Sequence, residues 1–502
     1  MAAKEYTAKT LTADFADTAD FEQKKTEGME VEVRQKNAGR KMFAFQLFSY
    51  LRPHLSALFL FILALNSSAA DWPQFLGPHA NGVSDETGLL DRWPSNGPPV
   101  VWAKRIGTGY GPVVVRGNVL ALHHRIGDEE IVEGLDARNG ESLWRYSYPS
   151  HFEDPYGYNN GPRGSPLLTN DCCYTLGAEG KLVCLQSGSG KLVWQRDTTA
   201  DWTVPPAFFG VGSSPIIESG RLIAMVGGQT NSGVVAFDPG TGKTIWESVG
   251  WKNWEGKRMI GWPGEPPVHW QEWEKQASYA TPVAATIHGK RQLLCLMRQG
   301  LVSLNPTNGE VNFSFWFRSP VTESVNAMNP VVVDDLILLS AAYYKIGSVC
   351  LRVKADGKSV EEVWRSTVLE MHWSTPIYQA GYLYGFSGRN EPDAHCRCVE
   401  FKTGKLMWDR DERWAHHSTE PPTVYGRGSC MIADGKLIAL GEGGLLGLFK
   451  LNPEKAEEIA RWQVPMLRYP AWAAPVLSGK KLYLRGEGVL VCLDIAKLAD
   501  QG

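Results

Sequence analysis

A repeat constrains this chain more than any other feature of its sequence. Eight times, a pair of mostly small residues precedes Pro, or Cys in one copy, and a β-branched run and a turn follow. The copies begin at Tyr110–Pro112, Gly164–Pro166, Ser213–Pro215, Ala280–Pro282, Met328–Pro330, Ser374–Pro376, Gly428–Cys430 and Ala473–Pro475. A recurring unit of this kind indicates a repeat architecture, so it takes precedence over any local assignment of helix or strand.

A second signature marks the end of most units: an apolar alternation, a polar turn around Gly and a strand that ends in Trp. These tryptophans are Trp144, Trp194, Trp246, Trp316, Trp364, Trp408 and Trp462. The eighth unit lacks one, but Trp102 lies upstream of the first unit in a matching apolar context. A propeller closes its ring when a terminal strand completes the last blade, which removes the exposed sheet edge.

We therefore predict an all-β fold over residues 99–499: an eight-bladed β-propeller of four-stranded antiparallel blades. The N-terminal strand around Trp102 is expected to complete the last blade. About 54 residues are available for each unit, loops included, and this suits a propeller blade. A row of β-sandwiches is the alternative, but it would not explain the displaced terminal strand.

The N-terminal 70 residues resemble a targeting segment rather than part of the fold. Residues 42–70 combine basic positions, an apolar run from Leu55 to Leu65 and a small-residue end at Ala70, as in a secretory signal peptide. The run is too short for a membrane span, and no Cys follows it for lipid attachment. Residues 1–41 form a polar extension, and we hypothesise that translation starts at Met42. Residues 71–98 are an N-terminal segment, and the product is expected to be periplasmic or extracellular.

Charge and cysteine content exclude two classes of function. The chain has 51 basic and 54 acidic residues without long blocks, so a nucleic-acid partner is not expected. Of the nine cysteines, four occupy a third-strand position that is a small residue in the other blades. These are Cys184, Cys350, Cys398 and Cys492, against Gly134, Ala236, Ser303 and Gly447. They are expected to be small buried fillers rather than metal ligands or disulfides.

The ending L-x-x-x-x-G-x-x-x-W, as in residues 185–194, resembles the tryptophan-docking repeat of quinoprotein-type, or PQQ-like (pyrroloquinoline quinone), β-propellers. The resemblance covers about residues 99–499. That family contains quinone-dependent alcohol dehydrogenases, polyvinyl-alcohol-dehydrogenase-like proteins and the non-enzymatic lipoprotein of the outer-membrane barrel assembly machinery. The repeat is specific for the fold and does not assign an activity.

The resemblance also draws attention to the adjacent residues Cys172 and Cys173. In the dehydrogenases of this family a disulfide between adjacent cysteines packs against the quinone. In other blades of this chain, however, the equivalent positions hold Arg221–Leu222 and Lys436–Leu437, which are ordinary strand residues. An ordinary strand pair is therefore the favoured interpretation.

The residue three before each Pro, or its equivalent, is expected at the mouth of the central channel. These residues are Gly109, Arg163, Gly212, Tyr279, Ala327, Trp373, Arg427 and Trp472, with Tyr156, Arg298, Arg318, Asn326 and His372 as neighbours. Arginine binds carboxylates and aromatic faces stack on planar groups. The candidate cofactor-binding residues are Arg163, Tyr279, Trp373, Arg427, Trp472, Arg298, Asn326 and His372. The alternative is that these side chains plug the channel by packing on one another.

Two insertions are expected on the same side. Residues 146–163 are rich in Tyr and Gly, and residues 249–277 contain five tryptophans. Such long connections are usually functional or disordered, and their aromatic content argues against disorder. The second insertion is expected to be a lid or sugar-stacking surface, or else a structural flap.

No catalytic residue and no metal ligand can be assigned from the sequence. The resemblance implies a Ca²⁺ site of Glu, Asn and Asp oxygens with an Asp base, but Asp154, Glu391 and Asp393 form no matching pattern. Serine-nucleophile, zinc and haem signatures are absent from the sequence.

The main prediction is an exported, monomeric propeller that serves as a scaffold for binding ligands or proteins, with an unidentified protein, small molecule or carbohydrate at the channel mouth. One alternative is a PQQ-dependent oxidoreductase that uses the quinone with calcium to oxidise alcohols, polyvinyl alcohol or sugars. A further alternative is polysaccharide binding through the Trp-rich insertion.

Overall fold

The computed structural model describes residues 70–254, 279–321, 324–414 and 423–497, and of residues 255–278 only the backbone of two short strands. The predicted polar extension and signal peptide, and most of the Trp-rich insertion, lie outside the described residues. Residues Ala69–Gly502 form one compact unit. Among the described residues, no helix has the length and apolar character needed to cross a membrane.

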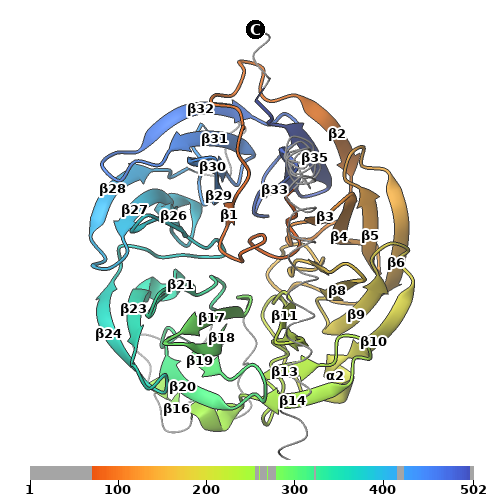
Figure 1. The fold of residues 1–502 in the computed structure, drawn as a ribbon, viewed down its shortest axis with the longest axis vertical. Coiled ribbons are helices and arrows are strands. Elements are labelled where there is room, and N and C mark those ends of the chain that lie inside the picture. Colours follow the sequence, from red (N-terminus) through yellow and green to blue (C-terminus); the bar gives the residue numbers. More distant parts are fainter. Residues whose placement is uncertain are drawn as a thin grey trace, which may run out of the picture. The chain divides into compact units, whose positions relative to one another are not determined.

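Eight sheets of antiparallel strands form a ring, as Figure 1 shows, so the predicted all-β, eight-bladed propeller is confirmed. Blade 1 consists of β3 (Val114–Arg116), β4 (Val119–Ile126), β5 (Glu129–Asp136) and β6 (Ser142–Pro149), and blade 2 of β7 (Leu167–Leu168), β8 (Cys172–Leu176), β9 (Lys181–Gln186) and β10 (Leu192–Asp197). Blade 3 consists of β11 (Ile216–Glu218), β12 (Arg221–Ala224), β13 (Val234–Phe237) and β14 (Thr244–Ser248), and blade 4 of β17 (Val283–Ile287), β18 (Lys290–Leu296), β19 (Gly300–Leu304) and β20 (Val311–Trp316).

Blades 5 to 8 consist of β21 (Val331–Val333), β22 (Leu336–Ala341), β23 (Gly347–Val353) and β24 (Val360–Ser366); β25 (Ile377–Gln379), β26 (Tyr382–Ser387), β27 (His395–Glu400) and β28 (Leu406–Asp411); β29 (Ser429–Ala433), β30 (Lys436–Leu440), β31 (Leu445–Lys450) and β32 (Glu457–Gln463); and β33 (Val476–Ser478), β34 (Lys481–Gly486), β35 (Val489–Asp494) and β2 (Val100–Arg105). The other elements are β1 (Val83–Ser84), the hairpin β15 (Met259–Ile260) and β16 (Val268–His269), the helix α2 (Thr198–Asp201), and the 3₁₀ turns η1 (Trp251–Trp254), η2 (Tyr343–Lys345) and η3 (Glu391–Asp393).

The ring closes as the sequence predicts. β2 pairs antiparallel with β35, and Trp102 lies opposite Cys492 in this pairing. The last blade therefore takes three strands from the C-terminal end of the ring and its outermost strand from the N-terminal end. This arrangement links both ends of the ring and leaves no unpaired blade edge at the closure.

Small residues precede each innermost strand because neighbouring strands crowd the channel. A side chain at Gly111 would meet the backbone carbonyl of Gly164 in the next blade. The polar members of these pairs join the blades: the Ser165 amide donates to the hydroxyl of Ser214 at 2.8 Å. Similar bonds link later blades, so the small polar residue before Pro both fits the space and satisfies a backbone donor.

Tryptophans on the outer strands connect each blade to the next. Their indole nitrogens donate to backbone carbonyls in the turn between the third and fourth strands of the following blade. The pairs are Trp102 to Ala137, Trp144 to Ser187, Trp194 to Pro239, Trp246 to Pro306, Trp364 to Phe401 and Trp408 to Asn452. All of these rings except Trp408 also lie against a turn glycine, as Trp144 does against Gly190, which leaves no room there for a side chain.

Two of the repeat tryptophans depart from this pattern. In blade 4 the residue opposite the small third-strand position is Phe313, whereas Trp316 pairs with Gly300 at the strand end. In blade 7, Trp462 lies against Gly97, in the segment before β2. In blade 7 the residue opposite Gly447 is Arg461, not Trp462. The sequence pattern therefore locates the outer strand in both blades but misses the residue opposite the small third-strand position in each.

The filler role of the cysteines is consistent with the strand register. Cys184, Cys350, Cys398 and Cys492 are each buried directly opposite an outer-strand tryptophan. All nine cysteines are free thiols. Cys172 and Cys173 lie on β8 as ordinary strand neighbours, with Cys172 packed toward blade 3 and Cys173 toward blade 1.

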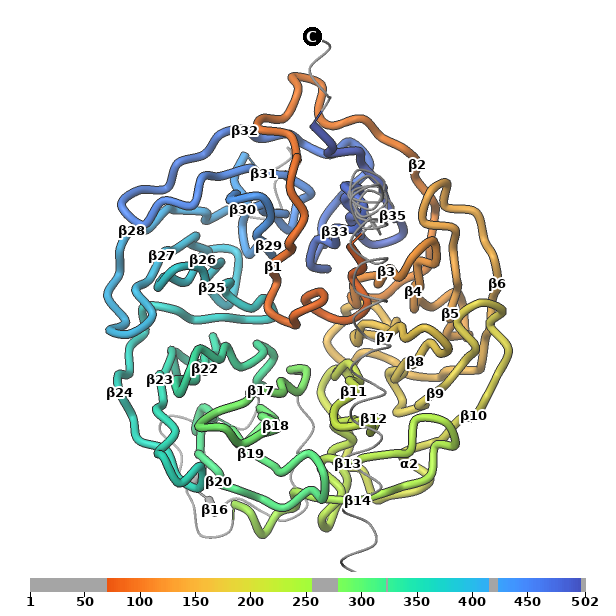
Figure 2. Tube along the Cα trace, in the orientation of Figure 1, coloured from red at the N-terminus to blue at the C-terminus, as the bar shows by residue number. Residues whose placement is uncertain are grey.

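The N-terminal segment crosses the ring. Figure 2 shows this segment running from the closure toward the centre, where β1 pairs in parallel with β29, the innermost strand of blade 7. Further toward the N-terminus, Trp72 bridges to Val115 of blade 1 and is almost fully buried. The segment thus extends across the channel from blade 7 to blade 1.

Candidate functional site

The central channel contains a pocket with a volume of about 180 Å³. It is lined by aromatic and small residues from every blade and from the N-terminal segment: Phe75, Leu76, Tyr110, Pro112, Tyr158, Arg163, Phe209, Gly212, Tyr279, Val325, Ala327, Tyr343, His372, Trp373, Ser374, Thr375, Ser429, Cys430, Trp472, Ala473 and Ala474. Most of them lie in the segments that lead into the innermost strands. Of the predicted channel-mouth residues, all except Gly109 and Arg427 belong to this lining.

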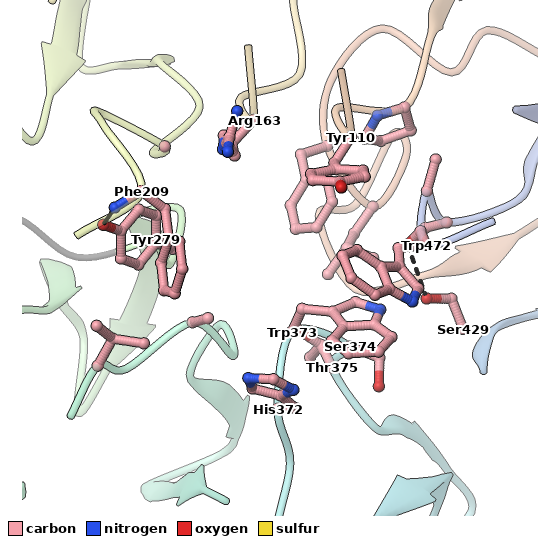
Figure 3. A pocket seen from close by; sticks show the side chains of 18 of the residues that line it. Tyr110, Arg163, Phe209, Tyr279, His372, Trp373, Ser374, Thr375, Ser429 and Trp472 are labelled. Carbon is pink, nitrogen blue, oxygen red and sulfur yellow. Dashed lines mark hydrogen bonds between the residues drawn. The ribbon is translucent and has the colours of Figure 1, made fainter. Parts of the chain in front are cut away.

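Two aromatic walls face each other across the pocket. Figure 3 shows Phe209 and Tyr279 on one side and Tyr110, Trp373 and Trp472 on the other. The Trp373 and Trp472 ring centres are 4.8 Å apart with the planes tilted by 39°, and Tyr110 lies 4.8 Å from Trp472. On the opposite wall the Tyr279 hydroxyl accepts the Phe209 amide at 2.7 Å. The walls leave an open centre, so these side chains do not plug the channel completely.

Arg163 lines the pocket but is already paired. Its Nη2 donates to Oδ2 of Asp154 at 2.6 Å, and its Nη1 donates to the Gly161 carbonyl. The guanidinium also lies over the rings of Tyr110 and Phe152. Burial lowers the pKa of Arg163, while the Asp154 carboxylate opposes that shift. Arg163 therefore presents a charge to the pocket that is largely neutralised from behind.

Arg427 lies behind the tryptophan wall rather than in the pocket lining. Its Nη2 donates to Glu442 at 2.8 Å and to Glu391 at 2.6 Å, and its Nη1 donates to the carbonyl of Arg389. Burial alone would lower the pKa of Arg427, but the two carboxylates outweigh it and raise the pKa. The guanidinium is 4.7 Å from the centre of the Trp373 ring.

Glu442 joins this cluster to the pocket wall. The carboxylate is fully buried and accepts the indole N–H groups of Trp472 and Trp414, each at 3.1 Å. The Arg427–Glu442 pair therefore fixes the orientation of Trp472 and supports Trp373 from behind. In this position Arg427 positions the wall; its use for binding a ligand stays a prediction.

Arg298 and Asn326 also lie outside the pocket lining. The Arg298 Nε donates to the Ser324 carbonyl, and the guanidinium lies 4.9 Å from the Phe208 ring centre. The Asn326 amide nitrogen is within bonding distance of the carbonyls of Met297, Arg298 and Phe317. Both side chains are buried and brace the segment between blades 4 and 5.

His372 and Trp373 line the pocket, and each has a ring nitrogen without a hydrogen-bond partner among the described residues. The Nε2 atom of His372 is 3.2 Å from the Tyr343 hydroxyl, whereas its buried Nδ1 atom has no hydrogen-bond partner among the described residues. The same is true of the Trp373 Nε1 atom. Burial, with the Arg427 and Arg389 charges, holds the pKa of His372 well below its usual range, so the imidazole is neutral at neutral pH.

The pocket suits a planar organic group better than it suits a metal ion. Two aromatic walls and two unpaired polar atoms match a flat ring with polar edges. The nearby carboxylates of Asp154, Glu391 and Glu442 already accept Arg, Tyr or Trp donors. In the part of the chain that the structure describes, no three His, Cys, Asp or Glu side chains are placed to hold a metal ion. The quinone that the resemblance implies would find flat aromatic surfaces here, whereas the calcium ion that it implies has no such ligand set among the described residues.

Sequence reasoning missed several lining residues. Tyr110 directly follows the predicted mouth residue Gly109, and Tyr158 lies in the insertion 146–163, so both had a local signal. Phe75 and Leu76 belong to the N-terminal segment, to which the repeat pattern assigned no role. Phe209 comes from the connection between α2 and β11, where no repeat position predicts an aromatic residue. Of the Trp-rich insertion, the three tryptophans after residue 254 lie outside the described residues.

Comparisons with known proteins support the fold. The family model described as outer membrane protein assembly factor BamB matches residues 128–410. The quinohemoprotein alcohol dehydrogenase from Comamonas testosteroni superposes with a TM-score of 0.59 at 12% identity, covering 88% of this chain and 83% of that one. A likeness at this identity concerns the architecture alone.

Curated relatives match a smaller part of the chain. The dehydrogenase subunit of the quinone alcohol dehydrogenase from Komagataeibacter europaeus is 29% identical over 147 residues, which is 27% of this chain and 18% of that protein. Quinohemoprotein alcohol dehydrogenase ADH IIB from Pseudomonas putida is 26% identical over 161 residues, 30% of this chain and 20% of that protein. The matches thus span about a fifth of each relative.

These relatives correct the main functional prediction. A scaffold for binding ligands or proteins was expected from the lack of recognisable catalytic residues, but the curated relatives are named as dehydrogenases. The scaffold prediction is therefore wrong, and the oxidoreductase alternative is the one that the relatives favour. The physical reason for the error is that the pocket side chains come from many blades, so they form no local sequence motif.

Proposed function

This chain belongs to the PQQ-like repeat family of β-propellers, and from that premise we propose that it is a quinoprotein-type oxidoreductase that oxidises a hydroxyl compound in the channel pocket. The observation that carries the proposal is the pocket itself: two aromatic walls, with the unpaired His372 Nδ1 and Trp373 Nε1 atoms facing no protein partner among the described residues. A buried polar atom without a protein partner is a position where a bound ligand or water can form a hydrogen bond.

Different residues of the pocket would hold different parts of the quinone. Trp373 and Trp472 would hold a planar quinone by stacking, and the Trp373 N–H and Arg163 would contact its polar edge. When bound, such a quinone accepts the two electrons that leave the substrate carbon. Ser374, Thr375 and Ser429 add hydroxyl groups to the same lining.

His372 is the proposed proton acceptor for the substrate hydroxyl. Its ring is neutral because of its lowered pKa, and the Tyr343 hydroxyl bonded at Nε2 orients it so that Nδ1 remains available. A positioned base of this kind typically contributes a factor of about 10² to 10⁴ in rate. Because His372 is neutral near pH 7, its role should not change activity between about pH 6 and 8.

The test is titration of the full chain with pyrroloquinoline quinone, followed by dye-linked oxidation of alcohols, with Ca²⁺ and with a chelator. We expect saturable quenching of tryptophan fluorescence and dye reduction. His372→Ala should lower turnover about 100-fold or more while quinone binding changes little. The matched control is His395→Ala, because His395 on β27 pairs with Asp409 on β28 and is outside the pocket lining. Absence of saturable binding, or binding without dye reduction for any alcohol, would overturn the proposal.

We also propose that this activity is exported. The support is the pattern of residues 42–70, which predicts a signal peptide. N-terminal sequencing of protein recovered from outside the cytoplasm should begin at Asp71, and recovery of an uncleaved cytoplasmic chain would contradict export.

A further inference from the structure

The connection between β6 and β7 brings two tyrosines to the pocket. Residues 150–163, called the strap here, contain Tyr156 and Tyr158, and Tyr158 belongs to the pocket lining. Both side chains keep large exposed surfaces: 51% for Tyr156 and 45% for Tyr158. Exposed aromatic residues beside a pocket are typical of recognition surfaces rather than of core packing.

Tyr158 spans the gap between the two aromatic walls. Its ring centre lies 5.9 Å from Phe209 on one wall and 5.6 Å from Trp472 on the other. The interplanar angles are 70° and 60°, so neither contact is a face-to-face stack. Tyr156 continues this aromatic surface, 5.3 Å from Phe209. Tyr158 therefore packs edge-on against both walls, and a ring that enters the pocket passes beside it.

The ends of the strap are firmly held. Arg163 and Asp154 form an ion pair in which both side chains are at least nine-tenths buried. Arg125 donates to the carbonyls of Phe152, at 2.6 Å, and Asn160, at 3.2 Å. These contacts fix the strap on both sides of Tyr156 and Tyr158, so the two rings are presented in a defined position rather than on a loose loop.

We propose that Tyr158 is the specificity-determining residue of this pocket, and that it selects hydroxyl compounds carrying a flat apolar ring face over open-chain ones. This inference deepens the proposed function, because it names the substrate class of the same site. Aromatic side chains favour flat partners, since stacking adds to the burial of apolar area. The reaction would stay the same: the hydroxyl carbon becomes a carbonyl, two protons are released, and the two electrons reduce the dye that the assay supplies.

Two matched pairs of probes test the selection. Benzyl alcohol and 1-heptanol have the same number of carbons and one hydroxyl, and differ in the flat ring. Myo-inositol and sorbitol make the same comparison for a polyol. Binding is measured by calorimetry on the full chain, first without the quinone and then with it. We expect benzyl alcohol to bind about tenfold more tightly than 1-heptanol. A preference confined to myo-inositol would indicate a sugar-like ring and overturn the inference.

Variants assign the effect to the tyrosine. Tyr158→Ala should abolish the ring preference, and Tyr158→Phe should keep it, because the ring rather than the hydroxyl makes the contacts. The matched control is Tyr146→Ala, whose side chain bonds to Gln195 on the outer strands of blades 1 and 2 and is outside the pocket lining. Equal binding within both pairs, the same preference in Tyr158→Ala, or no detectable binding of any probe would overturn the inference.

The outcome is separable from the test of the proposed function. If the ring preference depends on Tyr158 but no dye is reduced, the inference is supported and only the oxidoreductase proposal is overturned. Dye reduction with equal kcat/KM for the two members of both pairs would sustain the oxidoreductase and overturn the inference. An unchanged thermal unfolding midpoint of Tyr158→Ala would show that a lost preference does not come from a damaged fold.

Discussion

Tryptophans occupy both the rim and the channel of this propeller, and the two sets are used differently. At the rim, residues such as Trp144 donate their indole N–H to a carbonyl of the next blade and cover a turn glycine. In the channel, Trp472 donates to a buried carboxylate, and the Trp373 Nε1 atom has no partner among the described residues. A rim ring is therefore fully used by the protein, whereas Trp373 keeps a polar atom that a ligand can use.

Residue type alone therefore does not distinguish a structural tryptophan from a ligand-binding one in a repeat protein. What separates the two sets is how completely the protein satisfies each ring. A buried indole N–H without a protein partner that lies in a pocket lining can form a hydrogen bond to a ligand or water there. The predictions that follow test this difference.

The largest effect is expected at the rim. Trp144→Ala removes a ring that is buried between blades 1 and 2, together with its hydrogen bond to Ser187. Such truncations leave a cavity and typically cost about 3–5 kcal/mol. Urea denaturation should show this loss, while probe binding in the channel is retained under native conditions. Trp144→Phe, which keeps most of the ring, should lose much less; equal losses would contradict the docking role.

A second contact at the rim, around Glu133, should make the stability of the fold depend on pH. Glu133 in blade 1 lies 3.4 Å from Lys104 of β2 and 3.5 Å from the His124 ring. Burial raises the pKa of Glu133, but the neighbouring polar groups of His124 and Ser142 and the charge of Lys104 outweigh it, and the pKa falls to about 2. The folded pKa is below the unfolded value of about 4.3, so this contact stabilises the fold above that value and is lost as pH falls toward 2.

Glu133→Gln should therefore lower the free energy of unfolding at pH 7 by about 1–2 kcal/mol after allowance for solvent screening. The difference from the parent protein should shrink between pH 5 and 2. Denaturant unfolding at several pH values checks it. A constant difference across this range would mean that packing, rather than the charge of Glu133, makes the contribution, and channel binding should be unchanged throughout.

The smallest stability effects are expected in the channel, where substitutions of the two neighbouring tryptophans should differ in their cost to stability. Trp472→Phe deprives Glu442 of a donor and should cost about 1–2 kcal/mol. Trp373→Phe removes an N–H that the protein does not use, so stability should change by less than about 0.5 kcal/mol, while quinone binding weakens several-fold. Thermal unfolding and fluorescence titration measure the two effects. A large stability loss in Trp373→Phe would break the distinction between rim and channel.

Much of the architecture could be predicted because it depends on local, repeated constraints. The eight units, the closure by the strand around Trp102 and the small residues opposite the rim tryptophans all repeat at a fixed position within a blade. There are two exceptions: Phe313 rather than Trp316 lies opposite Ser303 in blade 4, and Arg461 rather than Trp462 lies opposite Gly447 in blade 7.

The site could be predicted only in part. Arg163, Tyr279, His372, Trp373 and Trp472 line the pocket as residues near the channel mouth were expected to. Arg427 does not, because its guanidinium turns to Glu442 and Glu391, which lie 15 and 36 residues away in the sequence. Nothing in the sequence around Arg427 indicates that two carboxylates from other segments converge on it.

By itself, then, the sequence determined the ring: the number of blades, their closure and the rim contacts, since each arises from interactions within one repeat or between adjacent repeats. Only the tertiary structure decided which channel side chains remain available. Whether an arginine is neutralised or an indole N–H is left unpaired depends on partners brought from distant blades and from the N-terminal segment. Trp364 and Trp373 are nine residues apart in one chain, and only their surroundings make one a structural contact and the other a candidate for binding.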